Sequence, residues 1–253
     1  MTALEMTAVL LAGVAAGTIN TVVGSGTLIT FPTLLAVGVP PVTANVTNTI
    51  GLVPGSVSGA IGYRRELRGQ QGRLLRLASA SLVGGVVGAV LLLALPKEAF
   101  STIVPVLILI GCVLVILQPT IARRVAQRAA TRGGVPEHGA LWVWVLVMLT
   151  GVYGGYFGAA QGVLLIAIMG IGIQDSLQRL NGTKNVLAGL VNAVAALIFI
   201  VVADVDWLIA GLIAAGSVVG GQIGATVGRR LPPLALRMVI VTVGVVAIVA
   251  FVS

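Results

Sequence analysis

The chain has 253 residues, of which 58% are hydrophobic and only 9% are charged. A soluble domain carries about a quarter charged residues, so this composition excludes a water-soluble fold and predicts an integral membrane protein. The apolar runs are long and continuous rather than alternating, which favours transmembrane helices over a β-barrel. The net charge of +8 comes mostly from three short basic segments without interleaved aromatic residues, so we expect no nucleic-acid partner.

In chain order, the first half is predicted to contain a broken apolar region at 3–37 and spans at 43–63, 74–95 and 99–118. The second half repeats this series, with a broken region at 140–172 and spans at 181–203, 206–228 and 233–252. Spans of about 20 residues cross about 30 Å of hydrocarbon. We therefore expect a first repeat at 1–118, a basic cytoplasmic loop at 119–139 and a second repeat at 140–253.

Short sequence matches support the repeat. SLVGGVVGA (81–89) matches SVVGGQIGA (217–225) at an offset of 136, and NVTNT (45–49) matches NGTKN (181–185) at the same offset. Gly24 matches Gly158 at an offset of 134. Small residues at such spacing typically allow close helix packing, and this is our interpretation of six glycines, namely Gly84, Gly85, Gly88, Gly220, Gly221 and Gly224.

The charges of matching loops orient the two repeats. Five arginines lie between positions 64 and 76, whereas the equivalent loop of the second half contains Asp204 and Asp206. Cytoplasmic loops carry the positive charge, so the repeats are predicted to be inverted relative to each other. Inversion requires an odd number of crossings, and each broken region is therefore expected to be a re-entrant hairpin. The alternative is one long tilted helix in each broken region, which would place the 204–206 loop in the cytoplasm.

Polar residues interrupt both broken regions, at GSGT (24–27) and at YFGAAQG (156–162). Non-helical backbone at membrane depth occurs only where it is buried in protein or lines a wet cavity. Broken helices there present free N–H groups and a positive dipole end to an anion. The candidate binding residues are Asn20, Gly24, Ser25, Gly26 and Thr27 in the first region, and Tyr153, Tyr156, Gly158 and Gln161 in the second. The tyrosines are equally consistent with simple packing, and close packing is also the alternative for the tips as a whole.

The span after each hairpin begins with Asn and Thr residues. Asn45 and Asn181 are as consistent with helix N-caps as with a binding role. Further candidates lie one turn later, at Asn48, Thr49, Lys184 and Asn185. The alternative for Lys184 is that its side chain snorkels to the cytoplasmic interface. Asp175 and Arg179 have the i,i+4 spacing of an ordinary surface pair.

Residues 16–51 and 151–185 resemble the paired signature regions of the TauE/SafE family of membrane permeases. The resemblance covers nearly the whole chain and rests on a Gly-rich tip, a Pro or polar junction and Asn/Thr at the next span, each occurring twice. It implies export of sulfite or a small organosulfonate and no cofactor. The sequence departs from the family pattern at Lys184 and Asn185, where small or apolar residues are expected more often.

We therefore expect an all-α, multi-pass protein of a bacterial cell membrane. Its predicted function is secondary transport of a sulfur oxyanion by alternating access at a midplane site between the two tips, with a passive anion channel as the alternative. No metal site and no catalytic residues are expected, because HExxH, paired Cys/His ligands and GxSxG are absent from the sequence. The expected partners are the small anion and the lipid bilayer, and the oligomeric state stays open, a homodimer included.

Overall fold

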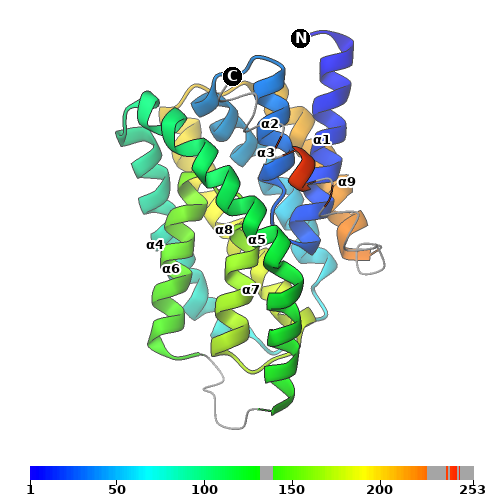
Figure 1. Ribbon diagram of the computed structural model, residues 1–253, viewed down its shortest axis with the longest axis vertical. Helices are drawn as coiled ribbons and strands as arrows, with labels where there is room; N and C mark the ends of the chain where they lie inside the picture. The colour runs from blue at the N-terminus through cyan, green and yellow to red at the C-terminus, as the bar shows by residue number, and fades with distance from the viewer. Residues whose placement is uncertain (132–138, 227–237, 239, 244, 246–253) are drawn as a thin grey trace.

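The computed structural model describes residues 1–131 and 139–226, together with 238, 240–243 and 245. All regular elements in these residues are α-helices, which confirms the predicted fold class. The first half contains α1 (Ala3–Val22), α2 (Thr27–Ala36), α3 (Pro41–Gly62), α4 (Gln71–Ala94) and α5 (Lys97–Thr131). The second half contains α6 (Leu141–Tyr156), α7 (Gln161–Gly172), α8 (Leu177–Val202) and α9 (Trp207–Thr226) (Figure 1). The span predicted at 233–252 lies largely outside the described residues.

Five of these helices, α1, α4, α5, α8 and α9, are long and apolar enough to cross a membrane, while α2, α6 and α7 are apolar but shorter. This agrees with a multi-pass membrane protein. The 22-residue helix α3 is not among the five. Its buried residues include Asn45, Thr47, Asn48, Thr49 and Ser56, so it carries a polar face into the protein interior.

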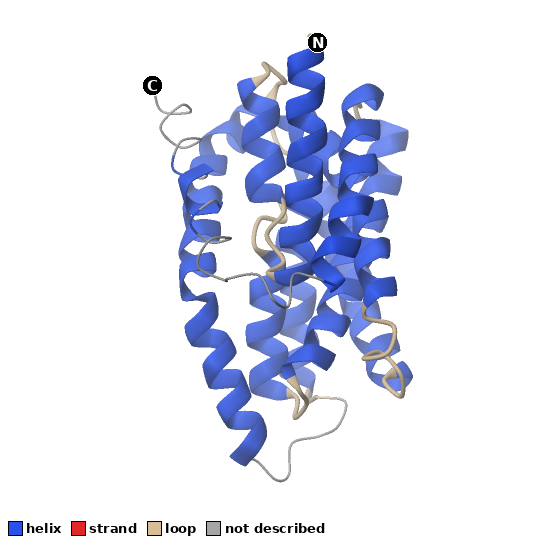
Figure 2. Ribbon diagram, turned by 90° about the vertical axis from the view of Figure 1, so that its right-hand side faces the viewer, coloured by secondary structure: helices blue, strands red, loops and turns tan. Residues whose placement is uncertain are grey.

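Each broken region folds back on itself. Figures 1 and 2 show α1 running from the N-terminal end of the molecule to about mid-height, where α2 turns back toward the same end. The second hairpin enters from the opposite end, with α6 rising to mid-height and α7 returning. This arrangement is consistent with inverted repeats. The alternative of one long tilted helix in each broken region is wrong, because the helices stop at Val22 and at Tyr156.

Equivalent glycine contacts occur twice, between α4 and α6 and between α9 and α1. A methyl group on Gly84 would lie 2.1 Å from the carbonyl oxygen of Met148, and one on Gly220 would lie 2.0 Å from that of Val14. Val14 and Met148 are themselves equivalent positions in the repeat, at an offset of 134. The predicted packing role is confirmed, because each of the six glycines would hold a methyl group 2.7 Å or less from a neighbouring helix.

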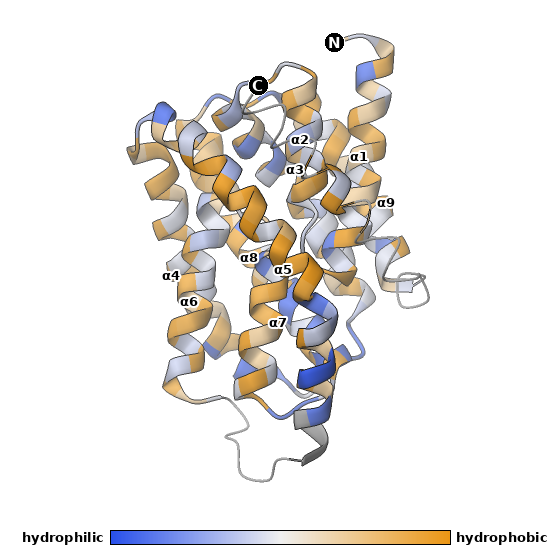
Figure 3. Ribbon diagram, in the orientation of Figure 1, coloured by the Kyte–Doolittle hydropathy of each residue, from blue (hydrophilic) through white to orange (hydrophobic). Residues whose placement is uncertain are grey.

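Charged residues collect at the ends of the molecule. The 64–76 segment and the last turns of α5 lie at one end, here called the basic end, whereas the 204–206 loop lies at the other (Figures 1 and 3). The predicted loop at 119–139 is wrong over its first part, because α5 continues to Thr131. Ala, Arg and Gln favour a helix there, and Val125 is buried against Gly170 of α7.

Two clusters of buried apolar side chains form the core. A larger cluster toward the N-terminal end contains Phe31, Phe100, Phe157 and Phe199. A smaller cluster toward the basic end is made of residues from α4 to α8, among them Leu77, Val143, Leu165 and Leu187. Residues of both tips, among them Val23 and Phe157, belong to the larger cluster, so the tips themselves are packed in the apolar core.

Candidate functional site

The two hairpin tips touch each other at mid-height. We call residues 23–26 the first tip and residues 157–160 the second tip. The backbone N–H of Gly162, just after the second tip, donates to the carbonyl oxygen of Gly24 over 3.0 Å. A methyl group on Gly24 would lie 2.4 Å from the Cα of Gly162, so this approach requires glycine. The two tips are thus in direct contact, while their role as one binding site stays a prediction.

Both hairpins end their first helix in the same way. Gly24 has a φ of 87° and Gly158 a φ of 79°, in the left-handed region that favours glycine. The N–H of Gly24 donates to the carbonyl of Ile19 over 3.0 Å, and the N–H of Gly158 donates to that of Tyr153 over 3.1 Å. Each glycine therefore stops a helix inside the protein and lets the chain turn back.

Hydroxyl and amide groups surround the start of α2. The Nδ2 of Asn48 donates to the Oγ1 of Thr27 over 3.4 Å, and the Oγ1 of Thr30 donates to the Oδ1 of Asn48. Ser25 is completely buried, and its hydroxyl has no hydrogen-bond partner. Gly26 packs against α1, where a methyl group would lie 2.5 Å from the carbonyl oxygen of Ala16.

Lys184 and Asn185 of α8 lie against the end of α1. The Lys184 ammonium donates to the carbonyl oxygens of Asn20 and Thr21 over 3.1 and 2.9 Å. The Nδ2 of Asn185 donates to the Thr21 carbonyl over 3.3 Å. The last carbonyls of a helix have no partners within it and carry its negative dipole end. Lys184 is completely buried, so the snorkelling alternative is wrong.

Side chains from α3 and α6 hold the second tip. The Tyr153 hydroxyl donates to the carbonyl of Ala159 over 2.5 Å, so it supports the tip rather than facing a ligand. The Nδ2 of Asn45 donates to the Tyr156 carbonyl over 2.9 Å. The Gln161 side chain packs against Gly154, where a methyl group would lie 2.4 Å from the amide carbon.

Unpaired polar atoms gather at the tips. Five buried side-chain polar atoms of the described residues have no hydrogen-bond partner, and four of them lie on or beside the tips: Ser25 Oγ, Asn45 Oδ1, Tyr156 OH and Gln161 Nε2. Buried polar groups are nearly always paired in native proteins. Three of these four groups are hydrogen-bond donors, which is the type of group that an oxyanion requires.

Most of the predicted site residues belong to this arrangement, but three have other roles. The Thr49 hydroxyl donates to the Asn45 carbonyl of its own helix over 2.9 Å. Asn20 contributes chiefly its backbone carbonyl, and its Nδ2 reaches the Oγ of Ser56 only at 3.5 Å. Tyr153 braces the second tip through its hydroxyl, as described above.

Sequence reasoning missed Thr30 and the role of Asn45. The capping alternative is wrong for Asn45 and Asn181, because α3 begins at Pro41 and α8 begins after its N-cap Ser176. Pro at the first helical position is itself a start signal. With the helix start read from Pro41, the three-residue spacing places Asn45 and Asn48 on one face of α3.

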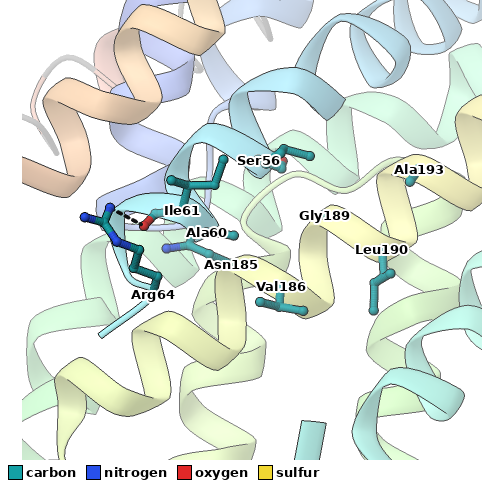
Figure 4. Close-up of a pocket in the computed structure, with 10 residues that line it drawn as sticks. Ser56, Ala60, Ile61, Arg64, Asn185, Val186, Gly189, Leu190 and Ala193 are labelled. Carbon is teal, nitrogen blue, oxygen red and sulfur yellow. Dashed lines mark hydrogen bonds between the residues drawn. The ribbon is translucent and has the colours of Figure 1, made fainter. Parts of the chain in front are cut away.

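A groove runs between α3 and α8. It has a volume of about 400 Å³ and lies between the last turns of α3 and the middle of α8. Figure 4 shows Arg64 at one end of the groove and Ala193 at the other, with Asn185 and Ser56 between them. A smaller pocket of about 230 Å³ lies between α3, α4 and α8 at the opposite end of the molecule, with Lys97 and Asp204 in its wall.

An ion-pair network joins the two halves at the basic end. Asp175 pairs with Arg179 as predicted, but it also pairs with Arg73 of α4 over 2.6 Å. Arg73 is buried, so this is more than a surface pair. Burial alone would raise the pKa of the Asp175 carboxyl, but hydrogen bonds from Arg73 and Arg179 outweigh it and hold that pKa below its usual range.

The described residues form no metal-binding cluster. In the part of the chain that the structure describes, no group of three or more His, Cys, Asp or Glu side chains could hold a metal ion. The polar groups at the tips are amides, hydroxyls and one ammonium, with no carboxylate among them. These groups suit an anion better than a hard cation.

Comparison with known proteins identifies the family. The profile described as "Sulfite exporter TauE/SafE" matches residues 9–251. Probable membrane transporter protein ORF9 of Sinorhizobium sp is 28% identical over 218 residues, covering 83% of this chain and 78% of its own. Probable membrane transporter protein YfcA of Escherichia coli K12 is 27% identical over 239 residues, covering 91% and 83%. These names indicate a membrane transporter rather than an enzyme. The chain belongs to the TauE/SafE sulfite exporter family.

Proposed function

We propose that this transporter exports a small sulfur oxyanion, sulfite or a short organosulfonate, through a site where the two tips meet. The observation that carries the proposal is the group of buried, unpaired donors there, contributed by Ser25 of the first half and by Tyr156 and Gln161 of the second. An oxyanion presents several acceptor oxygens and would satisfy donors from both halves at once. The description of the family as sulfite exporters points to the same class of substrate.

The helix ends at the tips support an anionic substrate. Each tip combines the negative C-terminal end of one helix with the positive N-terminal end of the next. The carbonyl ends of α1 and α6 are occupied, by Lys184 in the first case and by Asn45 in the second. The helices α2 and α7 begin at the tips, where the N–H of Gly162 already bonds to the Gly24 carbonyl, so the helix dipoles rather than free N–H groups would attract an anion. The tips therefore present positive dipole ends to a ligand.

Alternating access fits the arrangement of the two hairpins. They enter from opposite ends and meet at one contact, Gly24 with Gly162. Two hollows lie away from this contact, namely the groove between α3 and α8 and the smaller pocket between α3, α4 and α8. Movement of one half against the other would expose the contact to each side in turn.

Flux measurements in liposomes test the proposal. Protein-dependent efflux of sulfite or 2-hydroxyethanesulfonate should saturate with concentration, and the absence of flux for both anions would refute the proposal. Ohmic current without saturation would instead favour a passive channel. Ser25→Ala should reduce the flux. Ser81→Ala is the matched control, because Ser81 is also fully buried and unpaired but lies on α4 away from the tips.

A further inference from the structure

Lys184 has an unusual environment for a membrane lysine. Its side chain is fully buried, and its ammonium rests on two backbone carbonyls at the end of α1. The stem passes the point where the tips meet. A methyl group on Gly162 would lie 2.9 Å from the Lys184 Cδ and 2.5 Å from the Gly24 Cα. The lysine is thus built into the contact between the two halves.

No carboxylate balances this charge in the described part of the chain. The charged groups of neighbouring elements are Arg64 and Glu66 of the loop after α3, together with Arg73, Asp175 and Arg179, and Asp175 pairs with both Arg73 and Arg179. The loop at 204–206 lies at the other end of the molecule (Figure 1). A charge held inside a membrane protein without a partner is unfavourable and usually marks function. The partners of Lys184 are instead neutral carbonyl oxygens and the negative end of a helix dipole.

Backbone carbonyls at the C-terminal end of a broken helix are the groups that coordinate sodium in many secondary transporters. An ammonium is also a compact monovalent cation. The equivalent position of the other repeat is Asn48, which is uncharged and bonds to Thr27 and Thr30. A cation is therefore present at this position in one half only.

We propose that Lys184 is a built-in counter-cation: its ammonium occupies the place that a bound alkali ion would take, so anion transport needs no sodium. This inference rests on the proposed function, because it assumes that the ligand at the tips is an anion. The positive charge that such an anion requires stays with the protein throughout the cycle. One negative charge then crosses the membrane with each substrate anion.

The first test uses the unaltered protein in liposomes with 2-hydroxyethanesulfonate, whose sulfonate group carries no proton near neutral pH. Flux should be unchanged when all sodium is replaced by N-methylglucamine. If the protein moves the sulfonate only with sodium, the proposed function stands and this inference fails. If it moves neither this anion nor sulfite under any condition, the proposed function itself fails.

The second test empties the position. Lys184→Ala should lower flux in N-methylglucamine by roughly ten- to a hundredfold, as expected for a lost charge-assisted hydrogen bond. Sodium or ammonium should restore a large part of this flux, because either cation fits between the same carbonyls. Lys184→Met is the matched control: it fills the space without charge, so neither cation should restore its flux. A folded Lys184→Ala protein that no cation restores, or that transports normally without one, would overturn the proposal.

Discussion

The two tips have the same backbone conformation but different side chains around them. Gly24 and Gly158 end their helices with the same hydrogen bond and the same left-handed conformation. Around the first tip lie a charged ammonium and several hydroxyls, whereas the second tip contains two alanines and is braced by Tyr153 and Asn45. The repeat has kept the framework that stops a helix at mid-depth, while the side chains that would meet a ligand have diverged.

Under the proposed function, this difference separates residues that shape the site from residues that would select a ligand. The end of α1 is held by a cation and the end of α6 by a neutral amide. Both interactions satisfy carbonyl groups, but only the first adds a full positive charge. We therefore expect substitution of either tip glycine to reduce transport severely. Substitution of the side chains that differ between the tips should reduce anion binding to unequal extents.

The largest effect is expected at the tip glycines. Gly24→Leu and Gly158→Leu should each abolish transport while the protein still inserts in the membrane. The alanine variants should separate the tips, because a methyl group at Gly24 meets backbone at 2.4 Å whereas one at Gly158 lies 3.0 Å from the nearest atom, the Gly154 carbonyl oxygen. Gly158→Ala then chiefly carries the left-handed strain of about 1–2 kcal/mol. Liposome flux normalised to inserted protein is the measurement, and normal transport by both leucine variants would show that the tips only pack.

The next largest effect is expected in anion affinity. Lys184→Ala should weaken binding about ten- to a hundredfold, from the roughly 1.5–3 kcal/mol of a charge-assisted hydrogen bond. Asn45→Ala removes a neutral bond of about 0.5–1.5 kcal/mol and should weaken binding no more than about tenfold. Lys184→Arg should restore affinity only in part, because a planar guanidinium needs another approach angle. Dissociation constants measured by calorimetry would compare the two variants. Equal losses of anion affinity in Lys184→Ala and Asn45→Ala would show that the positive charge adds nothing to binding.

The helix breaks and the glycine contacts between helices could be predicted from the sequence. Polar and glycine residues inside apolar regions predicted both breaks, and the small-residue spacing predicted the packing glycines. These features are local, so they are visible without knowledge of distant partners. The extent of α5 was not predicted, although Ala, Arg and Gln favour a helix after position 119. It depends on the contact of Val125 with Gly170, a residue of another helix.

The partners within the site were also beyond sequence reasoning. Periodicity can place Asn45 on a face of α3, but it does not show that the face meets the Tyr156 carbonyl in the other half. Lys184 could be identified as an unusual cation, whereas its burial against Asn20 and Thr21 depends on how α1 and α8 pack. Tyr153 and Tyr156 appear equivalent in sequence, yet only one hydroxyl has a partner.

A smaller effect on anion affinity is expected at these two tyrosines, and it should separate binding from stability. Tyr156→Phe removes an unpaired hydroxyl and should lower anion affinity severalfold, by about 0.5–1.5 kcal/mol, without changing thermal stability. Tyr153→Phe leaves the Ala159 carbonyl without its donor, which should destabilise the second tip by about 1–3 kcal/mol. Melting temperature and dissociation constant should therefore respond to different variants. If Tyr156→Phe lowers the melting temperature instead, its hydroxyl has a structural role.

The smallest effect on transport is expected at the basic end, where Asp175 joins the two halves away from both tips. Hydrogen bonds from Arg73 and Arg179 hold the pKa of its carboxyl below the usual value, despite partial burial. The native state therefore favours the ionised form, and the resulting stability is complete above the unfolded pKa of about 4. It is lost as the pH falls through the lower folded pKa.

Asp175→Asn should accordingly lower the melting temperature at pH 7, and the difference from the parent should shrink progressively below about pH 4. Substrate affinity at pH 7 should change less than about twofold, since neutral hydrogen bonds to the arginines persist. A loss of affinity as large as that of Lys184→Ala would show that the ion pairs at the basic end act on the site, and the contrast between the tips would then extend beyond the tips themselves.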